Sequence, residues 1–286
     1  MVELQVPEVD YTRYSNRQLA SVPLAVLALA LLVIAGWYVT TGAPVTPGME
    51  FTGGTEMRVQ TDVPQSEIPQ AFDEEVSSVT ATRSSGNAYI VQFQSIDDDS
   101  LRSQAEQAGF DVVSVQTTSA SFGSESQRLA LYGIVAAFAG MSVLVFLMFR
   151  SFVPSIAVVL SAFSDIVIPI ALMNVLGIKL SLGTVTALLM LIGYSVDSDI
   201  LLNNHILRRS GGFYESTYRA MRTGVTMTLT SISAMAVMAL VAAIFQVDLL
   251  RSIGIVLVFG LTTDLMNTYM LNLSLLRWYK FEGVAR

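Results

Sequence analysis

The sequence predicts a polytopic α-helical membrane protein with one small α+β domain outside the membrane. Hydrophobic residues make up 52% of the 286 residues and charged residues only 14%, whereas about a quarter of the residues of an ordinary soluble domain are charged. The apolar residues gather in six long runs, and the hydrophilic stretch 42–127 separates the first run from the other five. This distribution predicts six transmembrane helices with a domain between the first two.

Each apolar run is long enough to cross a hydrocarbon core of ~30 Å, which takes ~20 helical residues. The predicted spans are Leu19–Thr41, Leu129–Phe149, Val153–Leu176, Leu180–Asn204, Val225–Phe245 and Ser252–Leu276. The first run is too long for a signal peptide, and no small-residue cleavage site follows it, so we expect it to persist as a helix. The chain then divides into an N-terminal segment (1–18), a first span (19–41), a domain (42–127), five further spans (128–276) and a C-terminal segment (277–286).

Arginine and lysine are unequally distributed between the two predicted membrane faces. One face receives Arg13, Arg17, Arg150, Arg208, Arg209, Arg219, Arg222, Arg277, Lys280 and Arg286; the other receives Arg58, Arg83, Arg102, Arg128, Lys179 and Arg251. Because loops rich in these residues stay on the cytoplasmic side, we expect both termini in the cytoplasm. The segment 42–127 is then extracytoplasmic and the protein lies in the cell membrane.

The segment 42–127 contains strand and helix patterns in the order β-α-β-β-α-β. The elements are a strand at Met57 and Val59, a helix at Ile68, Ala71, Phe72 and Val76, strands at Val79–Arg83 and Ala88–Gln94, a helix at Leu101, Ala105 and Ala108, and a strand at Val113, Val115 and Thr117. This order is typical of a ferredoxin-like domain.

Charge and residue usage exclude several classes of function. Thirteen of the 23 acidic residues lie between Gly42 and Glu125, and the chain has two lysines beside 14 arginines. We interpret this as adaptation to high salt, where repulsion is screened; the alternative is simply an acidic loop domain. A net charge of −7 argues against binding nucleic acid. With no cysteine and one histidine, His205, we expect no metal centre, no cofactor and no enzymatic activity.

Four carboxylates fall within the predicted spans, where ionisable groups are costly and point to function. They are Asp165, Asp197, Asp199 and Asp264. Counting ~1.5 Å per residue from the helix ends places Asp165, Asp197 and Asp264 about 16–20 Å deep, so these three could form one interior cluster. The sequence does not tell which of Asp197 and Asp199 faces the interior. Asp197 and Asp199 are two residues apart and should face different ways. The alternative role for such groups is to hydrogen-bond the helices together.

Other polar residues mark interior helix faces. A stripe on the fifth span consists of Arg222, Thr226, Thr230 and Ser233, and Asp264 shares a face with Gly260, Asn267 and Thr268. Six helices surrounded by lipid on most sides would leave too many polar groups uncovered, namely Asp165, Thr226, Thr230, Asp264 and Asn267. We therefore expect a second membrane protein with a similar bundle to cover them.

Four motifs, in order and spacing, resemble those of the SecF family of the RND superfamily. Gly48-Met49-Glu50-Phe51-Thr52-Gly53-Gly54-Thr55 resembles the family's G-I-D-F-T-G-G-T, Ser164-Asp165 its His-Asp, Gly193-Tyr194-Ser195-Val196 the start of its G-Y-S-V-N-D-T, and Arg222-Thr223 its R-T-x-x-T-S-x-T-T. The chain departs from the family pattern at Asp197-Ser198-Asp199, which replaces Asn-Asp-Thr, and at Asp264, where bacterial members usually have Ser. The composition is similar to that of an archaeal, halophile-type member.

The resemblance implies an RND-type half bundle that acts in protein export. The chain would be an auxiliary subunit of the Sec translocon, working with a SecD-like membrane protein and the translocon channel on a translocating unfolded polypeptide. It would draw on the proton or sodium gradient. Asp165, Asp264, Asp197 and Asp199 are then the candidates for ion coupling, with Arg222 as a cationic neighbour of Asp197 or Asp199.

Two other functions stay open from the sequence. An RND-type half-transporter for the efflux of small molecules or lipids would need a larger external portion than this chain has. A non-conducting scaffold for translocon assembly would keep the external domain but would not need the buried carboxylates.

Overall fold

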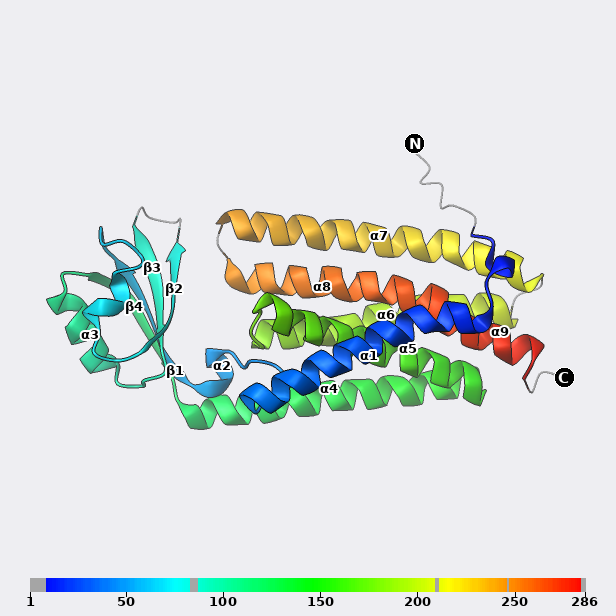
Figure 1. The fold of residues 1–286 in the computed structure, drawn as a ribbon, viewed down its shortest axis with the longest axis horizontal. Helices are drawn as coiled ribbons and strands as arrows, with labels where there is room; N and C mark the ends of the chain where they lie inside the picture. Colours follow the sequence, from blue (N-terminus) through cyan, green and yellow to red (C-terminus); the bar gives the residue numbers. More distant parts are fainter. Residues whose placement is uncertain (1–8, 83–86, 209–210, 246, 284–286) are drawn as a thin grey trace.

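Six long helices form a bundle, and a small sheet domain lies at one end of it (Figure 1). The computed structural model describes residues 9–82, 87–208, 211–245 and 247–283. The long helices are α1 (Asn16–Thr41), α4 (Ala120–Phe149), α5 (Phe152–Leu176), α6 (Leu182–Arg208), α7 (Phe213–Phe245) and a last helix made of α8 (Asp248–Met266), the π-helical turn η3 (Asn267–Asn272) and α9 (Leu273–Phe281). All six are long and apolar enough to cross a membrane. The predicted fold class is confirmed, and the chain is a multi-pass membrane protein.

Several helices extend beyond the apolar stretches that predict them. Helix α4 begins at Ala120 rather than Leu129, and α7 begins at Phe213 rather than Val225. The Ser119 hydroxyl accepts a hydrogen bond from the Phe122 amide and caps the early start of α4, as side chains of this type do at helix N-termini. Hydropathy locates the part of a helix that suits hydrocarbon, and these helices continue past it into polar surroundings.

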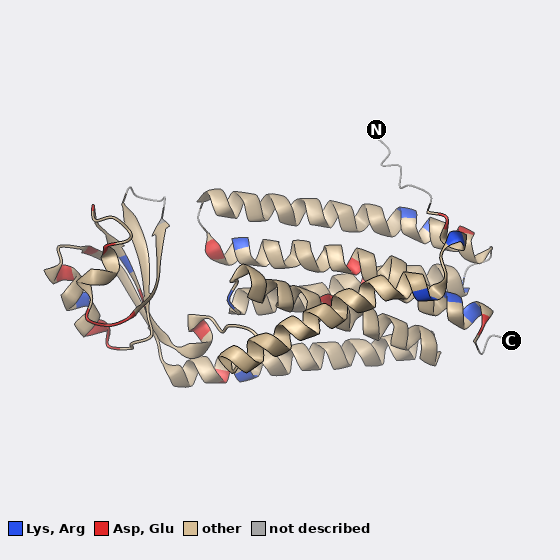
Figure 2. Cartoon of the chain, in the orientation of Figure 1, with Lys and Arg blue, Asp and Glu red and all other residues tan. Residues whose placement is uncertain are grey.

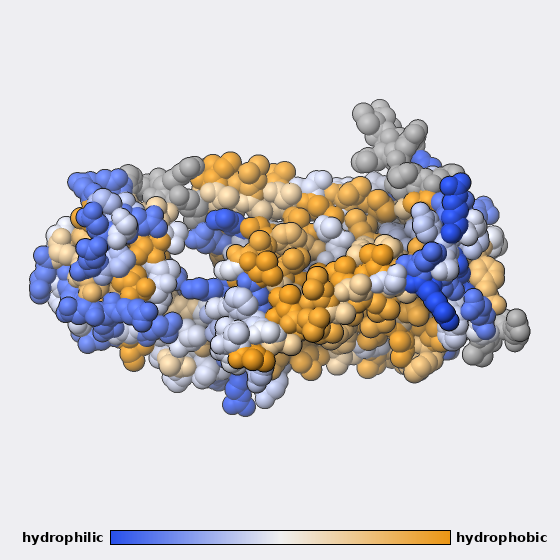
Figure 3. Space-filling model, in the orientation of Figure 1, coloured by the Kyte–Doolittle hydropathy of each residue, from blue (hydrophilic) through white to orange (hydrophobic). Residues whose placement is uncertain are grey.

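The helices divide into a buried set and a peripheral set. Helices α5, α6 and α8 contact one another. In an apolar 18-residue stretch, 67% of the residues of α5 are buried, but only 6% in α4 and 11% in α7. Basic residues gather at the bundle end that holds both chain termini, and acidic residues are concentrated in the sheet domain (Figure 2). Between these ends, the face of the bundle seen in Figure 3 is mostly apolar.

The sheet domain is a four-stranded antiparallel sheet with one covered face. Its strands are β1 (Gly54–Gln60), β2 (Val76–Thr82), β3 (Ala88–Phe93) and β4 (Asp111–Thr118), in the order β2-β3-β1-β4. Helix α3 (Asp98–Gln107) packs against one face, where Met57, Val91 and Phe93 are fully buried. The central pair β1 and β3 with β2 and β4 at the edges gives the strand order of a ferredoxin-like domain.

The first predicted helix of this domain is wrong. Ile68–Ala71 forms only a four-residue 3-10 turn, η2, and Phe72 is already extended. Ile68 and Phe72 are nevertheless buried in the domain core, so the spacing of apolar residues reflected burial rather than a helix. Val76, which was assigned to this helix, begins β2.

A β-bulge changes the side-chain alternation predicted for the last strand. Between Arg58 and Val59 of β1 the register shifts, so that Arg58 pairs with Ser114 and Val59 with Val112. Val113 is the extra residue and is 56% exposed. Val112 and Val115 pack on the core instead, because a bulge moves successive side chains to the other face.

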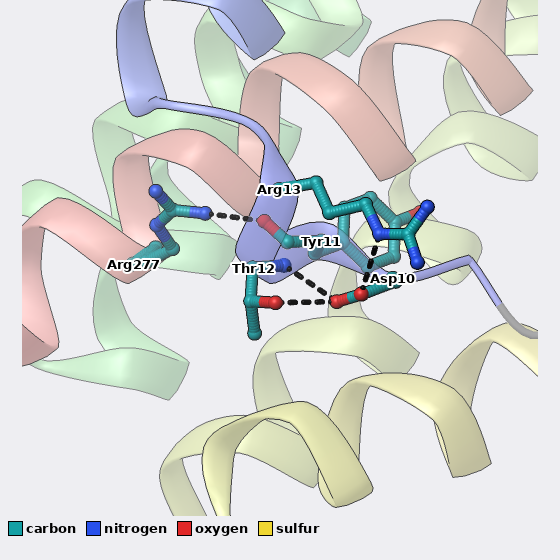
Figure 4. A network of polar contacts seen from close by, with 5 residues as sticks. All are labelled: Asp10, Tyr11, Thr12, Arg13 and Arg277. Carbon is teal, nitrogen blue, oxygen red and sulfur yellow. Dashed lines mark hydrogen bonds and ion pairs between the residues drawn. The ribbon is translucent and has the colours of Figure 1, made fainter.

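A short N-terminal segment is tied across the bundle end that holds the termini (Figure 4). Arg277 of α9 donates to the carbonyl oxygens of Tyr11 and Tyr14 at 2.9 and 2.8 Å. The Tyr11 ring is buried and its hydroxyl donates to Met221 Sδ of α7 at 3.6 Å. Burial raises the pKa of Tyr11 to about 12, so this hydroxyl keeps its proton at any physiological pH. The segment therefore links α7 to α9.

Candidate functional site

Three carboxylates from three different helices meet in the interior of the bundle. Asp165 of α5, Asp199 of α6 and Asp264 of α8 are 0%, 0% and 1% exposed. The three groups are near enough to interact electrostatically. Buried carboxylates are stable only with hydrogen-bond donors around them, and each of these has such donors.

Asp165 and Asp264 are held by side chains from neighbouring helices. Ser195 Oγ of α6 donates to Asp165 Oδ2, and Asn267 Nδ2 of η3 donates to Asp165 Oδ1, both at 2.6 Å. Ser198 Oγ of α6 lies 2.8 and 3.0 Å from the two oxygens of Asp264. Both carboxylates thus receive donors that fix their positions.

Asp199 connects with the same network through η3. Thr268 Oγ1 and Asn272 Nδ2 lie 2.8 Å from Asp199 Oδ1, and Thr268 Oγ1 is also 3.2 Å from Asp264 Oδ1. A hydroxyl has one hydrogen to donate, so Thr268 can serve only one of the two carboxylates at a time. The Ser161 hydroxyl of α5 lies close to Asp199, and among the described residues neither this hydroxyl nor Asp199 Oδ2 has a further hydrogen-bond partner.

Helical spacing and a change of helix type bring these groups together. On α6, Ser195, Ser198 and Asp199 follow the three- and four-residue spacing of one helix face. In the last helix the π-helical turn at Asn267–Asn272 adds residues to one turn, and turns of this type are frequent at functional sites. Its side chains reach two partners, since Asn267 bonds to α5 and Asn272 to α6.

The structure places Asp199, rather than Asp197, in the cluster. Asp197 is exposed and lines a cavity of about 400 Å³ between α6, α7 and α8, with Tyr194 and Asn204. The cluster suggested by depth alone, Asp165, Asp197 and Asp264, is therefore wrong in one member, and of the two candidates on α6 it is Asp199 that faces the interior. An α-helix turns about 100° per residue, so residues two apart point to nearly opposite sides, and a depth estimate does not tell which side is interior.

Arg222 lies on α7 and is exposed. Its position beside Asp197 or Asp199 stays a prediction. Among the polar groups from which a covering bundle was expected, Asp165, Asp264 and Asn267 are buried within this chain's own helices. These three groups therefore need no covering bundle, contrary to the expectation, and only the α7 residues Thr226 and Thr230 of that set lie at the periphery.

The sequence reasoning did not single out Ser198 and Asn272 as partners of the carboxylates. A signal for both is present in the spacing. Ser198 stands three residues after Ser195, and Asn272 continues the series of Asp264 and Thr268 at steps of four. Polar residues at such steps form one stripe on a helix.

The glycine-rich motif after α1 lies far from the carboxylates, at the joint between bundle and sheet domain. Gly48 N donates to Leu180 O at 2.6 Å, and Glu50 Oε2 accepts from the Leu182 amide at 2.5 Å, where α6 begins. Phe51 is buried in the short helix α2 (Met49–Thr52). The hydroxyl of Thr52 bonds within the same turn.

The two glycines that follow α2 have backbone conformations that suit glycine. Gly53 and Gly54 have φ of 80° and 132°, a region that other residues rarely adopt. A Cβ on Gly53 would lie 2.7 Å from Ala120 N, at the start of α4, and one on Gly54 would overlap Phe93 O. The two glycines of the motif therefore allow the chain after α2 to pass close to the start of α4 and to β3. The motif Gly193-Tyr194-Ser195-Val196 lies on α6. Its Ser195 bonds to the carboxylate cluster, whereas Gly193 and Tyr194 are exposed.

Within the described ranges, no group of three or more His, Asp or Glu side chains is arranged to hold a metal ion.

Comparisons with known proteins agree on one family. The family model described as "Protein export membrane protein SecD/SecF, C-terminal" matches residues 99–282. The chain is 72% identical over 288 residues to the protein-export membrane protein SecF of Haloferax volcanii and 68% identical over 292 residues to that of Haloquadratum walsbyi, with 100% of each chain covered. Both organisms are haloarchaea. The SecF of Methanocaldococcus jannaschii is 36% identical over 93% of this chain and 96% of its own length.

A solved structure shares the fold. The crystal structure of SecDF, a translocon-associated membrane protein from Thermus thermophilus, superposes with a TM-score of 0.73 at 19% sequence identity. The match covers 96% of this chain and 39% of the SecDF chain. The chain thus corresponds to well under half the length of SecDF. From the family match over most of its length and the high identity over all of it, this chain belongs to the SecF family of protein-export membrane proteins.

Proposed function

We propose that this chain is an auxiliary subunit of the Sec translocon that acts with a SecD-like membrane protein and uses an ion gradient to promote export of unfolded polypeptide. Its relatives are named for protein export, and a solved relative of the fold is described as translocon-associated. The observation that carries the use of a gradient is the buried cluster of Asp165, Asp199 and Asp264. A structural subunit has no need of three carboxylates in its interior.

The cluster suits a site whose charge changes. Burying one carboxylate away from water is costly, and like charges close together raise that cost. Protonation of one carboxylate removes part of the charge and so favours a different arrangement of the helices. Thr268 lies within hydrogen-bonding distance of both Asp199 and Asp264. A change of charge at either carboxylate would change which of the two accepts the Thr268 hydrogen bond. This would make or break a contact between α6 and η3.

We assign Asp165, Asp199 and Asp264 to the ion-coupling site itself. Asp197 and Arg222 belong at its edge, on the exposed sides of α6 and α7. Asp197 lines the cavity between α6 and α7 together with Ser231, so an ion could approach the bundle there. In this arrangement the SecD-like partner covers the polar stripe of α7.

We further propose that both termini lie in the cytoplasm, that residues 42–127 lie outside, and that residues 19–41 and 128–276 hold the membrane-spanning segments. The bundle end with the termini has the basic residues (Figure 2), as is typical of the cytoplasmic face. Since the chain has no cysteine, single cysteines report the orientation. Gln107→Cys on α3 should react with an impermeant thiol reagent on intact cells, and Glu282→Cys only after permeabilisation. The reverse pattern would invert the topology.

Export by membrane vesicles tests the function as a whole. Vesicles that contain the translocon and the SecD-like partner, with or without this chain, are compared with and without an imposed ion gradient. The proposal predicts that the gradient stimulates export only when the chain is present. A passive assembly scaffold would instead raise export equally in both conditions, and that result would reject the proposed use of the gradient.

A further inference from the structure

Residues 44–50, here called the connecting segment, lie between α1 and the sheet domain and are bound to the turn between α5 and α6. The Leu180 amide of that turn donates to Thr46 O at 2.8 Å, and Leu180 O accepts from the Gly48 amide at 2.6 Å. These bonds belong to a parallel β-bridge between the two segments. The connecting segment is therefore fixed to the turn that precedes α6.

The connecting segment is also bound to both helices that this turn joins. Near the end of α5, the buried Asn174 side chain donates through Nδ2 to Pro44 O at 2.9 Å. At the start of α6, the Glu50 carboxylate accepts from the Leu182 amide at 2.5 Å. The first amides of a helix have no partner within the helix, and a negative charge is favourable at this end. Glu50 therefore satisfies α6 and ties it to the connecting segment.

On its other side the connecting segment continues into the sheet domain. Helix α2 forms its end and β1 begins at Gly54; in Figure 1, α2 lies between the sheet and the bundle. Phe51 of α2 is buried, and a Cβ on Gly123 of α4 would lie only 2.7 Å from Phe51 O. Such close packing leaves little room for α2 to move on α4. The sheet domain, the connecting segment and the α5–α6 turn are therefore joined as one body.

The turn between α7 and α8 is not attached to the sheet domain in this way. A cavity of about 500 Å³ lies between them, with Glu56 and Gln92 of the sheet on one side and Asp248 and Ser252 of α8 on the other. Among the described residues, no hydrogen bond or ion pair joins these two sides. The α7–α8 turn can therefore shift relative to the sheet domain without breaking a polar contact.

The carboxylate cluster spans the boundary between these two parts of the bundle. Asp165 and Asp199 are on α5 and α6, which are tied to the connecting segment, whereas Asp264 is on α8. Thr268 lies within hydrogen-bonding distance of both Asp199 and Asp264. Helix α6 is continuous from its first turn to Asp199, a length of about 25 Å at ~1.5 Å per residue. A displacement of α6 at the cluster is thus carried to its first turn, where Glu50 is bound.

We propose that Glu50 is a positioning residue that couples the carboxylate cluster to the sheet domain. Its bond to the Leu182 amide makes the domain follow α6 when the charge of the cluster changes. The inference rests on the proposed function, which supplies that change of charge.

Three substitutions distinguish coupling from simple helix capping. Glu50→Ala removes the accepting oxygen, whereas Glu50→Gln keeps an oxygen that accepts from the Leu182 amide. Ser181→Ala is the matched control, because Ser181 Oγ accepts from the Thr184 amide at 3.1 Å and caps the same end of α6 from within the bundle. If Glu50 only capped the helix, Glu50→Ala and Ser181→Ala would have the same consequences.

Distances between spin labels test the coupling directly. The chain has no cysteine, so labels are attached at Gln107→Cys on α3 and at Ile244→Cys on the exposed end of α7, in the complex with a cysteine-free SecD-like partner. Replacing all three cluster carboxylates by Asn keeps the cluster neutral. We expect this replacement to shift the distance between the labels by a few ångström in the otherwise unchanged, Glu50→Gln and Ser181→Ala proteins, and not in Glu50→Ala.

A second pair of labels reports on the body that should stay rigid. With Leu176→Cys at the exposed end of α5 in place of Ile244→Cys, the distance to position 107 should not change on neutralising the cluster. In Glu50→Ala this distance distribution should broaden. If Glu50→Ala does not accumulate, Asn174→Ala, which removes the bond from α5 to the connecting segment, replaces it with the same expected result.

Two outcomes would overturn the proposal. Equal loss of the shift in Glu50→Ala and Ser181→Ala would show that Glu50 only caps α6. A shift that persists in Glu50→Ala, or that is absent from the otherwise unchanged protein, would show that Glu50 does not couple the cluster to the domain.

Export by vesicles separates this inference from the proposed function. We expect Glu50→Ala to lower the gradient-dependent part of export several-fold and to leave the rest unchanged, and Ser181→Ala to leave both parts unchanged. Full gradient stimulation in Glu50→Ala would reject the coupling role alone. Wild-type export that does not respond to the gradient would reject the proposed function instead, and the label distances would still decide whether Glu50 ties the domain to α6.

Discussion

The helices that carry the carboxylates differ from the peripheral helices in how their polar groups are satisfied. Asp165, Asp199 and Asp264 receive their hydrogen bonds from other helices or from η3. On α7, by contrast, Thr226 and Thr230 each donate to a carbonyl oxygen four residues earlier in the same helix, at 2.8 Å. The interior network exists only when α5, α6 and α8 are assembled. The α7 hydroxyls are satisfied without any neighbour.

The two peripheral helices also differ from each other. Between Arg128 and Arg150, α4 has no charged residue, and leucines, valines and phenylalanines such as Leu147 are exposed along it. Helix α7 is equally uncovered but carries the stripe from Arg222 to Ser233. Apolar faces suit lipid. A polar stripe on a helix with so little cover within the chain is the surface that we expect a SecD-like partner to occupy.

The largest effect is expected from overfilling the contact between the buried helices. A Cβ on Gly260 of α8 would overlap the fully buried Leu191 of α6. Gly260→Val should lower the free energy of unfolding by about 1–3 kcal/mol or more, as overpacking does. The matched control is Gly140→Val on α4, where a Cβ meets nothing within 4 Å. Thermal unfolding in detergent measures both, and equal losses would remove the distinction between buried and peripheral helices.

Removing donors from the interior network should cost less, but still clearly more than removing them from α7. Asn272→Ala leaves the buried Asp199 with one donor fewer, and loss of a partner from a buried polar group costs about 1–3 kcal/mol. Thr230→Val on α7 removes a hydroxyl that bonds only to its own helix and should change stability by less than about 0.5 kcal/mol. The free energy of unfolding of each variant, measured by reversible unfolding in mixed micelles, distinguishes the two effects. Similar values for the two variants would contradict the contrast.

The peripheral helices should differ in partner binding rather than in stability. Thr230→Trp on the α7 stripe is expected to reduce recovery of the SecD-like partner several-fold in mild detergent, because it changes the shape and polarity of the contact surface. Val143→Trp on α4, also exposed, should leave recovery unchanged. Quantitative co-purification measures both. Loss of the partner only with Val143→Trp would move the interface to α4.

The smallest effect concerns the N-terminal link between α7 and α9. Arg277→Gln removes two hydrogen bonds to the Tyr11 and Tyr14 carbonyl oxygens, while the buried Tyr11 ring keeps its packing. Amide exchange of residues 9–14 should quicken by roughly tenfold, which corresponds to about 1.4 kcal/mol. Arg13→Gln, which acts only on the exposed Asp10, is the control. Exchange that is equally fast in both variants would show that Arg277 does not hold the segment.

The features of the fold that depend on long sequence patterns were predicted correctly. The features that depend on a local irregularity were not. Six spans and the strand order follow from runs and alternations many residues long. The helix predicted from Ile68 to Val76 is only a 3-10 turn at Ile68–Ala71, and the outward Val113 depends on a single bulge. Asp165 and Asp264 could be assigned to the interior site from the sequence because each is the only carboxylate in its predicted span. Asp199 could not be separated from Asp197, because the interior side of α6 is set by its packing against α5 and α8.

The most direct test of the central claim compares coupling with stability in the same variant. Asn resembles a protonated Asp, with nearly the same shape, one acceptor oxygen and one donor group, but it cannot bind or release a proton. We predict that Asp165→Asn, Asp199→Asn and Asp264→Asn, combined, leave the protein level and partner recovery intact. Stability should be unchanged or higher, because a buried amide costs less than a buried carboxylate. The measurement is export in vesicles with and without an imposed ion gradient. Loss of only the gradient-dependent part is the predicted result, and an unchanged response of the triple variant to the gradient would contradict it.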